Sequence, residues 1–414
     1  MSNQVTYHVD NGILTICLNG RVDSANAAEI EAEVNAAHAA APGAPIVMDA
    51  EQLAYISSAG LRILLRLRKA EPELSVINVS SEVYEILEMT GFTEMMTIKK
   101  AYRHLSVDGC ELIGKGANGA VYRYDPETII KVYFNPDALP EIQRERELAR
   151  TALVLGINTA IPYDVVRVGD SFGTVMELLD AVPLSNLIKA DPEHLEQPLA
   201  YYVDMLKQIH STEVKPGDMP DMKQVALGWA KFDQDYLPVE LGDKLYRMVE
   251  AIPEQHTMMH GDYHTNNIMV RDGEALLIDM DTLCVGHPIF ELGSMFNAFV
   301  GFSEIDHTVT QGFLGFSHEL AGIFWRRALS MYLGTEEPER INEVETKAKI
   351  IGYMRLLRRT IRRSEPMRDK LIAYYKEQLI RLIPTIDELI FQPIKNHGVT
   401  GLICTHFSGH CYFK

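Results

Sequence analysis

The sequence HGDYHTNN spans residues 260–267, and Asp279 follows twelve residues after Asn267 in the segment LLIDMD. An aspartate, an asparagine five positions later and a further aspartate are the residues that phosphoryl transfer from a magnesium-bound nucleotide requires. Magnesium prefers oxygen ligands, so Asn267 and Asp279 are expected to bind the metal. Asp262 is then expected to accept the proton of the attacking hydroxyl group.

A hairpin explains the spacing of these residues. Two apolar runs flank the sequence RDGE at residues 271–274, and an Asp-Gly pair between such runs predicts a type I′ turn. Folding the chain about that pair places Asn267 opposite Ile278, the neighbour of Asp279. The two expected metal ligands therefore meet at the open end of one hairpin.

Two other interpretations of this segment stay open. An acidic turn beside a buried hairpin would give the same pattern without catalytic function. A zinc site could instead use His260, Asp262 and His264, although no third well-spaced ligand set accompanies them.

A second motif lies upstream, where the sequence GKGANGAV occupies residues 114–121. It matches G-x-G-x-x-G-x-V, but a strand, a turn and a strand follow it, in place of the helix that a dinucleotide-binding fingerprint needs. A glycine-rich hairpin allows the backbone to approach a triphosphate closely. Lys131 lies among apolar neighbours in the second strand, where it needs a phosphate or a carboxylate as partner. A flexible hairpin with an edge-strand lysine is the alternative.

A helix is predicted over residues 139–150, with Pro140 in its first turn. Glu145 and Glu147 are candidates to pair with Lys131, and they point to different faces of the helix. We expect Glu145 to be the partner.

Together these motifs resemble the aminoglycoside phosphotransferase and choline kinase group within the protein-kinase-like superfamily. The resemblance covers about residues 104–395 and places a phosphotransferase domain at residues 103–395. It implies an α+β fold with two lobes, an N-lobe over about residues 103–179 and a mostly helical C-lobe over about residues 180–395. ATP and Mg²⁺ would bind in the cleft.

The resemblance also implies roles for single residues. Lys131 would hold the α- and β-phosphates, and Glu145 would orient Lys131. Asp262 would be the catalytic base, and Asn267 and Asp279 would hold the metal.

Further nucleotide contacts follow from the same resemblance. The glycine-rich hairpin would contact the nucleotide through Gly114, Gly116, Gly119 and Val121. Residues 175–179 resemble the hinge, whose backbone at Glu177 and Leu179 would contact the adenine edge. Glu291 stands where the family usually has an aspartate, a change that conserves the charge.

The segment after Asp279 bears on the acceptor. Met280 and Asp281 replace the Phe-Gly of the protein-kinase DFG triplet, and only a short connection precedes the next helix. The chain therefore lacks the long segment that shapes a platform for peptides. A small hydroxylated substrate is expected, while a folded protein surface stays open as an acceptor.

The first hundred residues alternate short strands with helices, which predicts an α/β sandwich with one sheet. Strands are predicted over residues 13–18, 46–49, 74–79 and 96–98. Helices are predicted over residues 25–40, 61–65 and 82–89. Ser24 and Ser81 are the expected N-caps. The domain is expected to span residues 1–102.

Three segments of this domain, GRVD at 20–23, ISSAGL at 56–61 and TGF at 90–92, resemble the STAS domain of bacterial anti-sigma-factor antagonists. The resemblance implies a STAS-binding protein partner and a phosphorylatable serine, Ser58, at a loop-to-helix turn. A phosphate there would add about two negative charges at a helix N-terminus. Alternatively, Ser57 and Ser58 only cap the helix.

The bulk properties fit two or three globular domains in 414 residues. No apolar run reaches the length of a membrane span, and no signal peptide is expected at the N-terminus. Five scattered cysteines fit a reducing cytoplasm. The net charge of −18 argues against general nucleic-acid binding.

Two further features remain. A predicted helix carries a row of arginines on one face: Arg355, Arg358, Arg359, Arg362 and Arg363. A solvated face is the main interpretation, and docking of an acidic substrate or partner is the alternative. The tail, residues 396–414, contains cysteines and histidines without a zinc-binding spacing, and its role is unassigned.

Three functions are consistent with the sequence. The first is an ATP- and Mg²⁺-dependent phosphotransferase that acts on a small hydroxylated molecule and is coupled to the STAS domain. The second is a protein kinase that acts on a STAS serine, with Ser58 of this chain as a candidate. The third is a nucleotide-binding regulatory module without turnover, although every expected catalytic position is filled.

Overall fold

The computed structural model describes residues 4–116, 118–364 and 366–391. The chain divides into two compact units. The first comprises the described residues up to Tyr122, together with Ile130–Asp137 and Asp164–Val175. The second comprises the rest of the described chain. The tail with its cysteines and histidines lies outside the described residues.

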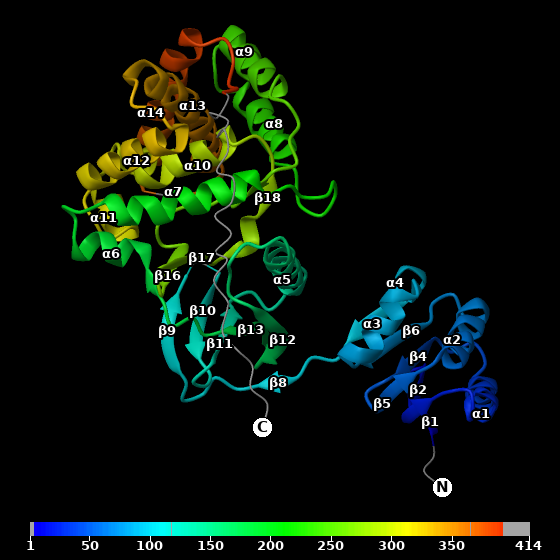
Figure 1. The fold of residues 1–414 in the computed structure, drawn as a ribbon. Coiled ribbons are helices and arrows are strands. Elements are labelled where there is room, and N and C mark those ends of the chain that lie inside the picture. The colour runs from blue at the N-terminus through cyan, green and yellow to red at the C-terminus, as the bar shows by residue number, and fades with distance from the viewer. Residues whose placement is uncertain (1–3, 117, 365, 392–414) are drawn as a thin grey trace, which may run out of the picture. The chain divides into compact units, whose positions relative to one another are not determined.

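The first unit begins with a five-stranded sheet in the order β1-β2-β4-β6-β7 (Figure 1). β1 and β2 form an antiparallel hairpin, and the other neighbours are parallel. The strands are β1 Val5–Asp10, β2 Ile13–Leu18, β4 Ile46–Asp49, β6 Ser75–Val79 and β7 Thr97–Lys100. A separate parallel pair consists of β3 Gly20–Val22 and β5 Leu53–Ile56.

Helices connect the parallel strands, as parallel pairing requires. They are α1 Ala27–Ala40, α2 Ser58–Ala70, α3 Ser81–Met89 and the short α4 Phe92–Met95. Their apolar faces join those of the sheet in one buried core that includes Leu14, Ile16, Ile30, Met48 and Leu64. The predicted α/β domain with one sheet is therefore present.

Two predicted helix caps in this domain were wrong. The N-cap of α1 is Asn26, not Ser24, because the chain first turns through a local hydrogen bond from the Asp23 N–H to the Asn26 side chain. The N-cap of α3 is Ser80, whose hydroxyl accepts from the Val83 N–H, and Ser81 is the first helical residue.

A six-stranded sheet follows in the order β8-β12-β13-β11-β10-β9. Its strands are β8 His104–Leu105, β9 Glu111–Lys115, β10 Gly119–Arg123, β11 Thr128–Tyr133, β12 Pro162–Val168 and β13 Ser171–Glu177. The predicted strand–turn–strand after the glycine-rich motif corresponds to β10 and β11. The predicted helix over residues 139–150 is α5 Leu139–Val154, with Pro140 in its first turn.

The second unit is mainly helical after α5 (Figure 1). Its helices are α6 Leu184–Ala190, α7 Glu196–Ser211, α8 Met222–Asp233, α9 Val239–Glu250, α10 Ile289–Phe299, α11 Thr308–Phe313, α12 His318–Leu333, α13 Pro338–Arg362 and α14 Arg368–Leu382. Three 3₁₀ turns are η1 Met280–Thr282, η2 Gly301–Ser303 and η3 Ile383–Thr385. Short strands form two small sheets: β14 Val182–Pro183, β16 Ile268–Arg271 and β17 Glu274–Leu277 in one, and β15 Met258–Met259 and β18 Cys284–Val285 in the other.

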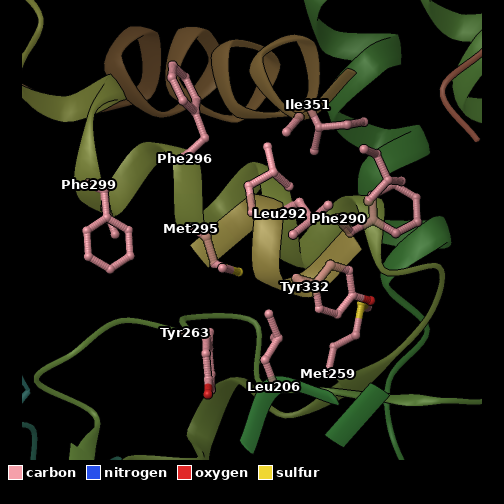
Figure 2. Packing of buried hydrophobic residues seen from close by; sticks show 14 of the residues in the cluster. Leu206, Met259, Tyr263, Phe290, Leu292, Met295, Phe296, Phe299, Tyr332 and Ile351 are labelled. Carbon is pink, nitrogen blue, oxygen red and sulfur yellow. The ribbon is translucent and has the colours of Figure 1, made fainter. Parts of the chain in front are cut away.

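Helix α10 is the centre of the second unit, since all eleven of its residues are buried. Figure 2 shows Phe290, Leu292 and Met295 of this helix among the buried residues of the cluster. Tyr263 of the HGDYHTNN segment belongs to the same cluster. The loop that carries the expected catalytic residues is therefore built on the most buried part of the unit.

Candidate active site

The hairpin that joins the expected metal ligands is β16–β17. Asp272 and Gly273 have φ angles of 52° and 83°, as a type I′ turn requires. Ile268 pairs with Leu277, and the Ile278 N–H donates to the Asn267 carbonyl at 3.0 Å. The predicted register, with Asn267 opposite Ile278, is confirmed.

The Asn267 side chain has a defined orientation. Its Nδ2 donates to the Asp262 carbonyl at 3.0 Å. Because a carbonyl only accepts, the amide nitrogen must face Asp262 and the amide oxygen must point away. Asn267 is buried, so this oxygen is held in one place.

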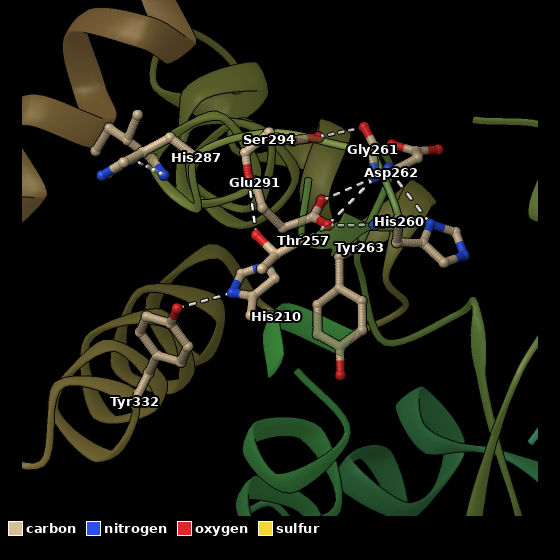
Figure 3. Close-up of polar contacts among 12 residues, drawn as sticks. His210, Thr257, His260, Gly261, Asp262, Tyr263, His287, Glu291, Ser294 and Tyr332 are labelled. Atoms are coloured by element: carbon tan, nitrogen blue, oxygen red, sulfur yellow. Dashed lines mark hydrogen bonds and ion pairs between the residues drawn. The ribbon is translucent and has the colours of Figure 1, made fainter. Parts of the chain in front are cut away.

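Glu291 of α10 fixes the backbone at the start of residues 260–267 (Figure 3). We call this segment, which contains the candidate catalytic residue Asp262, the catalytic loop. The Glu291 carboxylate accepts hydrogen bonds from the N–H groups of His260 and Gly261. Glu291 is 1% exposed, so these charge-assisted bonds form in a poorly hydrated environment. Glu291 therefore supplies a carboxylate acceptor to this loop.

A second buried layer lies behind Glu291. His210 of α7 places Nε2 3.9 Å from a Glu291 oxygen, and its Nδ1 is 2.7 Å from the Tyr332 hydroxyl of α12. Figure 3 shows this chain of groups running from α12 to the catalytic loop.

Gly261 adopts a conformation that only glycine accepts here. Its φ is +80°, and a Cβ would lie 2.4 Å from the Thr282 carbonyl oxygen. Thr282 also donates its hydroxyl to the His260 carbonyl at 2.7 Å. Glycine at position 261 thus allows η1 and the catalytic loop to approach closely.

Arg355 of α13 also holds the loop. Its Nη1 donates to the Gly261 carbonyl at 3.2 Å and to the Ser294 hydroxyl at 2.8 Å. Ser294 donates to the same carbonyl at 3.0 Å. The interpretation as a solvated face is wrong for Arg355. Its side chain is half-buried and contacts a loop 94 residues away in the sequence.

Asp262 itself is accessible, with 45% of its side chain exposed. Burial acts to raise the pKa of Asp262. The hydrogen bond and charge of His264 outweigh this effect, with smaller contributions from Arg355 and His260, so the pKa lies below its ordinary value. The carboxylate therefore stays ionised at neutral pH and can accept a hydrogen bond from a hydroxyl group.

The residues between Asp262 and Asn267 anchor the loop to the helices. Tyr263 donates its hydroxyl to the Tyr202 carbonyl at 2.6 Å, and Tyr202 donates to the Tyr263 carbonyl at 3.1 Å. Asn266 donates to the Phe313 carbonyl at 2.6 Å. The His264 ring packs edge-on against the Phe313 ring. Tyr202 and Ser294 lie outside the motif, and no signal in the sequence identified them.

Asp279 follows β17 directly. It is exposed, has a φ of 62° and begins η1, which packs against α5. The Leu277 N–H donates to the Asn158 carbonyl at 2.8 Å, which joins β17 to the loop after α5. On α5, Glu145 is buried and Glu147 is exposed.

The glycine-rich hairpin and Lys131 lie in the first unit. The Gly116 N–H donates to the Gly119 carbonyl at 2.9 Å, which closes the hairpin. A Cβ on Gly119 would meet the Val132 carbonyl oxygen at 2.4 Å, whereas Gly114 has ordinary space. Lys131 is half-buried, with Nζ 5.3 Å from the centre of the Tyr133 ring. Its pairing with Glu145, a residue of the second unit, stays a prediction.

The expected hinge lies at the end of β13. Glu177 uses its N–H to reach the Ile161 carbonyl at 3.0 Å, and its side chain lies 3.4 Å from Arg271. The Leu178 N–H donates to the Glu127 carbonyl at 2.8 Å. The Glu177 N–H is thus already used, and the contact of Glu177 and Leu179 with adenine stays a prediction.

Ser57 and Ser58 of the N-terminal domain occupy different positions at the start of α2. Ser57 is the N-cap of α2, and its hydroxyl accepts from the Ala59 N–H at 3.2 Å. Ser58 is exposed as the first residue of that helix. The cap interpretation therefore holds for Ser57.

Other expected features can be tested against the described part of the chain. Within it, no three His, Cys, Asp or Glu side chains converge on a metal position, and His260 turns Nε2 to the Ile278 carbonyl at 3.1 Å. This contradicts the zinc alternative. No described helix has the length and apolar character needed to cross a bilayer. Cys17, Cys110 and Cys284 are free thiols.

Comparison with known proteins identifies both parts of the chain. The profile of the phosphotransferase enzyme family (APH) matches residues 109–327, and that of the STAS domain matches residues 4–105. A Bordetella bronchiseptica protein described as an anti-sigma factor antagonist, BtrV, is 39% identical over 92 residues, which are 21% of this chain and 78% of that protein.

Solved structures resemble the larger part. The gentamicin-APH(2'')-IIa complex has 20% identity and a TM-score of 0.41, and the match covers 74% of this chain and 97% of that one. A choline/ethanolamine kinase family protein from Mesorhizobium loti has 14% identity and a TM-score of 0.44, with 67% and 92% covered. Identities and scores this low do not identify an activity.

The two profiles confirm the predicted fold class and the predicted enzyme class, a phosphotransferase with a kinase-like domain. Residues 109–327 are more than half of the 414 residues, so the chain belongs to the phosphotransferase enzyme family and carries an N-terminal STAS domain.

Proposed function

We propose that the protein transfers the γ-phosphate of ATP, in the presence of Mg²⁺, to a hydroxyl group of a small molecule, and that the STAS domain regulates this reaction. The main support is the catalytic loop. An accessible, ionised Asp262 stands on a backbone that Glu291 and Arg355 hold in place. A loop fixed in this way can position a base without reorganising during the reaction.

The side chains of the proposed site suit the binding of a nucleotide and a metal ion. Mg²⁺ would neutralise charge on the phosphates of ATP, and Asn267 and Asp279 would hold it. The orientation of the Asn267 amide fits this role, since its oxygen is the atom left for a cation. In the proposed site Lys131 would bind the α- and β-phosphates and Glu145 would orient Lys131.

Asp262 would orient the acceptor hydroxyl and accept its proton. The acceptor hydroxyl donates a hydrogen bond to the carboxylate, which orients its oxygen toward the γ-phosphorus. That oxygen forms the new bond to phosphorus while the bond to the β–γ bridging oxygen breaks, and ADP leaves. The hydroxyl proton passes to Asp262.

A small acceptor is favoured over a peptide. The chain between Asp279 and α10 contains only η1, β18 and a few connecting residues. Cys284 and Val285 of this connection pair with β15 and are buried, so it offers no long exposed segment for an extended peptide.

Substitution of Asp262 tests the proposal. Asp262→Asn should lower kcat by about 100- to 10,000-fold with a panel of hydroxylated acceptors, measured as ADP release. Asp272→Asn is the matched control, because asparagine tolerates the positive φ of that turn. Nucleotide binding without turnover, with any acceptor tried, would contradict the proposal and favour a regulatory module that only binds nucleotide.

A second candidate function is phosphorylation of a STAS serine. The exposure of Ser58 at the start of α2 supports it, since Ser57 already serves as the cap. Incubation with labelled ATP and mass spectrometry should then find phosphate on Ser58, absent in Ser58→Ala and in Asp262→Asn. If Ser58 stays unmodified under conditions where ADP is released, the second candidate function is contradicted and only the small-molecule reaction remains.

We also propose the domain limits and location expected from the sequence. A STAS domain over residues 1–102 would precede a phosphotransferase domain over residues 103–395, with the tail at 396–414. The free thiols of the described cysteines fit a cytoplasmic location. The STAS domain would contact a protein partner.

A further inference from the structure

The Asp262 carboxylate has a single polar side-chain contact among the described residues. His264 places Nε2 3.5 Å from Asp262 Oδ2, whereas His260 and Asn267 bond to the backbone of Asp262. The carboxylate is otherwise open, since 45% of the Asp262 side chain is exposed. An exposed carboxylate that turns about its own torsions meets an acceptor hydroxyl in the productive geometry only part of the time. His264 is therefore the group that can fix its direction.

The geometry indicates which nitrogen of the His264 ring carries the proton. Nδ1 is buried and has no hydrogen-bond partner in the described part of the chain. A proton on Nδ1 would be a buried N–H without an acceptor. It would also leave the Nε2 lone pair facing a carboxylate oxygen, so that two acceptors oppose each other. With the proton on Nε2, the ring instead donates toward Asp262 Oδ2.

The length of this contact suits a site before the substrate binds. A distance of 3.5 Å is long for a hydrogen bond to a carboxylate. Hydrogen bonds between groups of an active site are often long in the free enzyme and shorten in the complex with substrate. His264 and Asp262 need to approach by only a few tenths of an ångström to reach ordinary hydrogen-bond length.

The surroundings of the His264 ring hold it in place. Its side chain is 6% exposed, so the ring does not turn out into solvent. Phe313 of α11 packs edge-on against it, with the two ring centres 4.8 Å apart. Asn266 donates to the Phe313 carbonyl, which ties α11 to the catalytic loop. The Asn267 N–H donates to the His264 carbonyl at 3.0 Å. Nε2 is thus presented to Asp262 from a fixed position.

We propose that His264 is a positioning residue for Asp262: it donates to Oδ2 and leaves Oδ1 as the oxygen that takes the proton of the acceptor hydroxyl. This inference rests on the proposed phosphotransfer and assigns its proton transfer to one atom. Within the part of the chain that the structure describes, Oδ1 has no hydrogen-bond partner. Holding one oxygen and leaving the other free aims the carboxylate in one direction.

His264 does not relay the proton further. A relay would move the hydroxyl proton from Asp262 to a ring nitrogen. Nε2 already holds a proton, and the lone pair of Nδ1 is buried and lies on the other side of the ring. The proton taken from the hydroxyl therefore stays on Asp262 until it is lost to solvent.

Variants of the full chain that keep or remove the donor test the proposal. Glutamine places an amide N–H near the position of the histidine Nε2, whereas leucine fills a similar volume without a donor. His264→Leu should lower kcat by about 10- to 100-fold and change the KM for ATP by less than about twofold. His264→Gln should restore kcat to within about fivefold of the wild type. His256→Leu, at an exposed position, is the control and should change kcat by less than about twofold.

A double-mutant cycle shows whether His264 acts through Asp262. In an Asp262→Ala background, His264→Leu should change the residual rate by less than about twofold, because no carboxylate is left to position. Thermal unfolding of the Leu and Gln variants separates the loss of rate from a loss of stability. Wild-type kcat in His264→Leu, equal losses in the Leu and Gln variants, or an undiminished effect in the Asp262→Ala background would each overturn the proposal.

NMR of protein with isotope-labelled histidine tests the contact without turnover. The ring signals that disappear in His264→Gln belong to His264, and their nitrogen shifts should show the proton on Nε2. A proton on Nδ1 would overturn the proposal. If the proton is on Nε2 and no acceptor is phosphorylated, the contact stands and the proposed function fails. If His264→Leu phosphorylates acceptors at the wild-type rate, the proposed function stands and the role of His264 fails.

Discussion

The catalytic loop and the contact between α8 and α13 both bury a carboxylate, and the surroundings of the two carboxylates differ. Glu291 accepts from the N–H groups of His260 and Gly261. Both oxygens of Asp233 are buried without a hydrogen-bond partner in the described part of the chain. A buried carboxylate with donors fixes the backbone, whereas one without donors takes up a proton. Arg358 is the cation that faces Asp233, and the burial of the acid outweighs its charge.

The largest effect is expected at Glu291. Glu291→Ala leaves the N–H groups of His260 and Gly261 without an acceptor, and charge-assisted hydrogen bonds contribute about 1.5–3 kcal/mol each. We expect the free energy of unfolding to fall by about 3–6 kcal/mol and phosphotransfer to be lost. Urea unfolding and ADP release measure the two effects. Glu250→Ala, at an exposed site on α9, is the control and should change neither by much.

Glycine substitutions compare the catalytic loop with the glycine-rich hairpin. Gly261→Ala forces a side chain into φ +80° and against Thr282, which should cost about 2–4 kcal/mol of stability. Gly116→Ala meets only the Gly119 carbonyl oxygen at 4.0 Å, so its stability should change by less than about 0.5 kcal/mol. Thermal unfolding of both variants measures the difference. Equal losses would show that the two loops are equally constrained.

The sequence predicted the parts of this site that depend on local rules. The pairing of Asn267 with Ile278 follows from an Asp-Gly turn five residues away from each. Glu145 and Glu147 lie on different faces of α5, as predicted, with Glu145 buried and Glu147 exposed. The start of α1 was missed by two residues because Ser24 and Asn26 are both good caps, and a local bond to Asp23 decided between them.

Long-range contacts could not be predicted in this way. Arg355 reaches Gly261 across 94 residues, and one sequence contains no signal for that contact. A periodic row of arginines is typical of a solvated helix face. Only the packing of α8 against α13 reveals that Arg355 and Arg358 are half-buried beside aromatic rings.

The buried carboxylate without hydrogen-bond donors, Asp233, can be tested by varying the pH. Its pKa is about 8 in the folded protein, against 3.8 as the ordinary value, because burial disfavours the charged form and Arg358 only partly opposes this. Between about pH 4 and pH 8, the folded protein keeps on Asp233 a proton that the unfolded chain has already released. Stability should therefore fall as pH rises through this window and stop falling above it.

Asp233→Asn removes this titration. The variant should lose that component of the pH dependence and gain about 1–3 kcal/mol at pH 8, where the wild type holds a partly ionised buried acid. Urea unfolding from pH 5 to pH 9 provides the measurement. Asp235→Asn, at an exposed position two residues on, should keep the wild-type slope. A wild-type slope in Asp233→Asn would mean that Asp233 is ionised and paired in the folded protein.

The smallest effect is expected at Tyr263, where the catalytic loop has two anchors to α7. Tyr263→Phe removes the hydroxyl that donates to the Tyr202 carbonyl, but the Tyr202 hydroxyl still donates to the Tyr263 carbonyl. The carbonyl that loses its second donor belongs to a helix, so little desolvation cost remains, and a net loss of about 0.5–1.5 kcal/mol is expected.

A double-mutant cycle with Tyr202→Phe then measures whether the two anchors act together. Independent anchors give additive losses, and kcat stays near the wild-type value in each single variant because Glu291 still holds the backbone before Asp262. A loss of activity in Tyr263→Phe as large as that in Glu291→Ala would place the control of the loop in α7. Glu291 would then be one support among several, and the contrast with Asp233 would no longer explain how the loop is fixed.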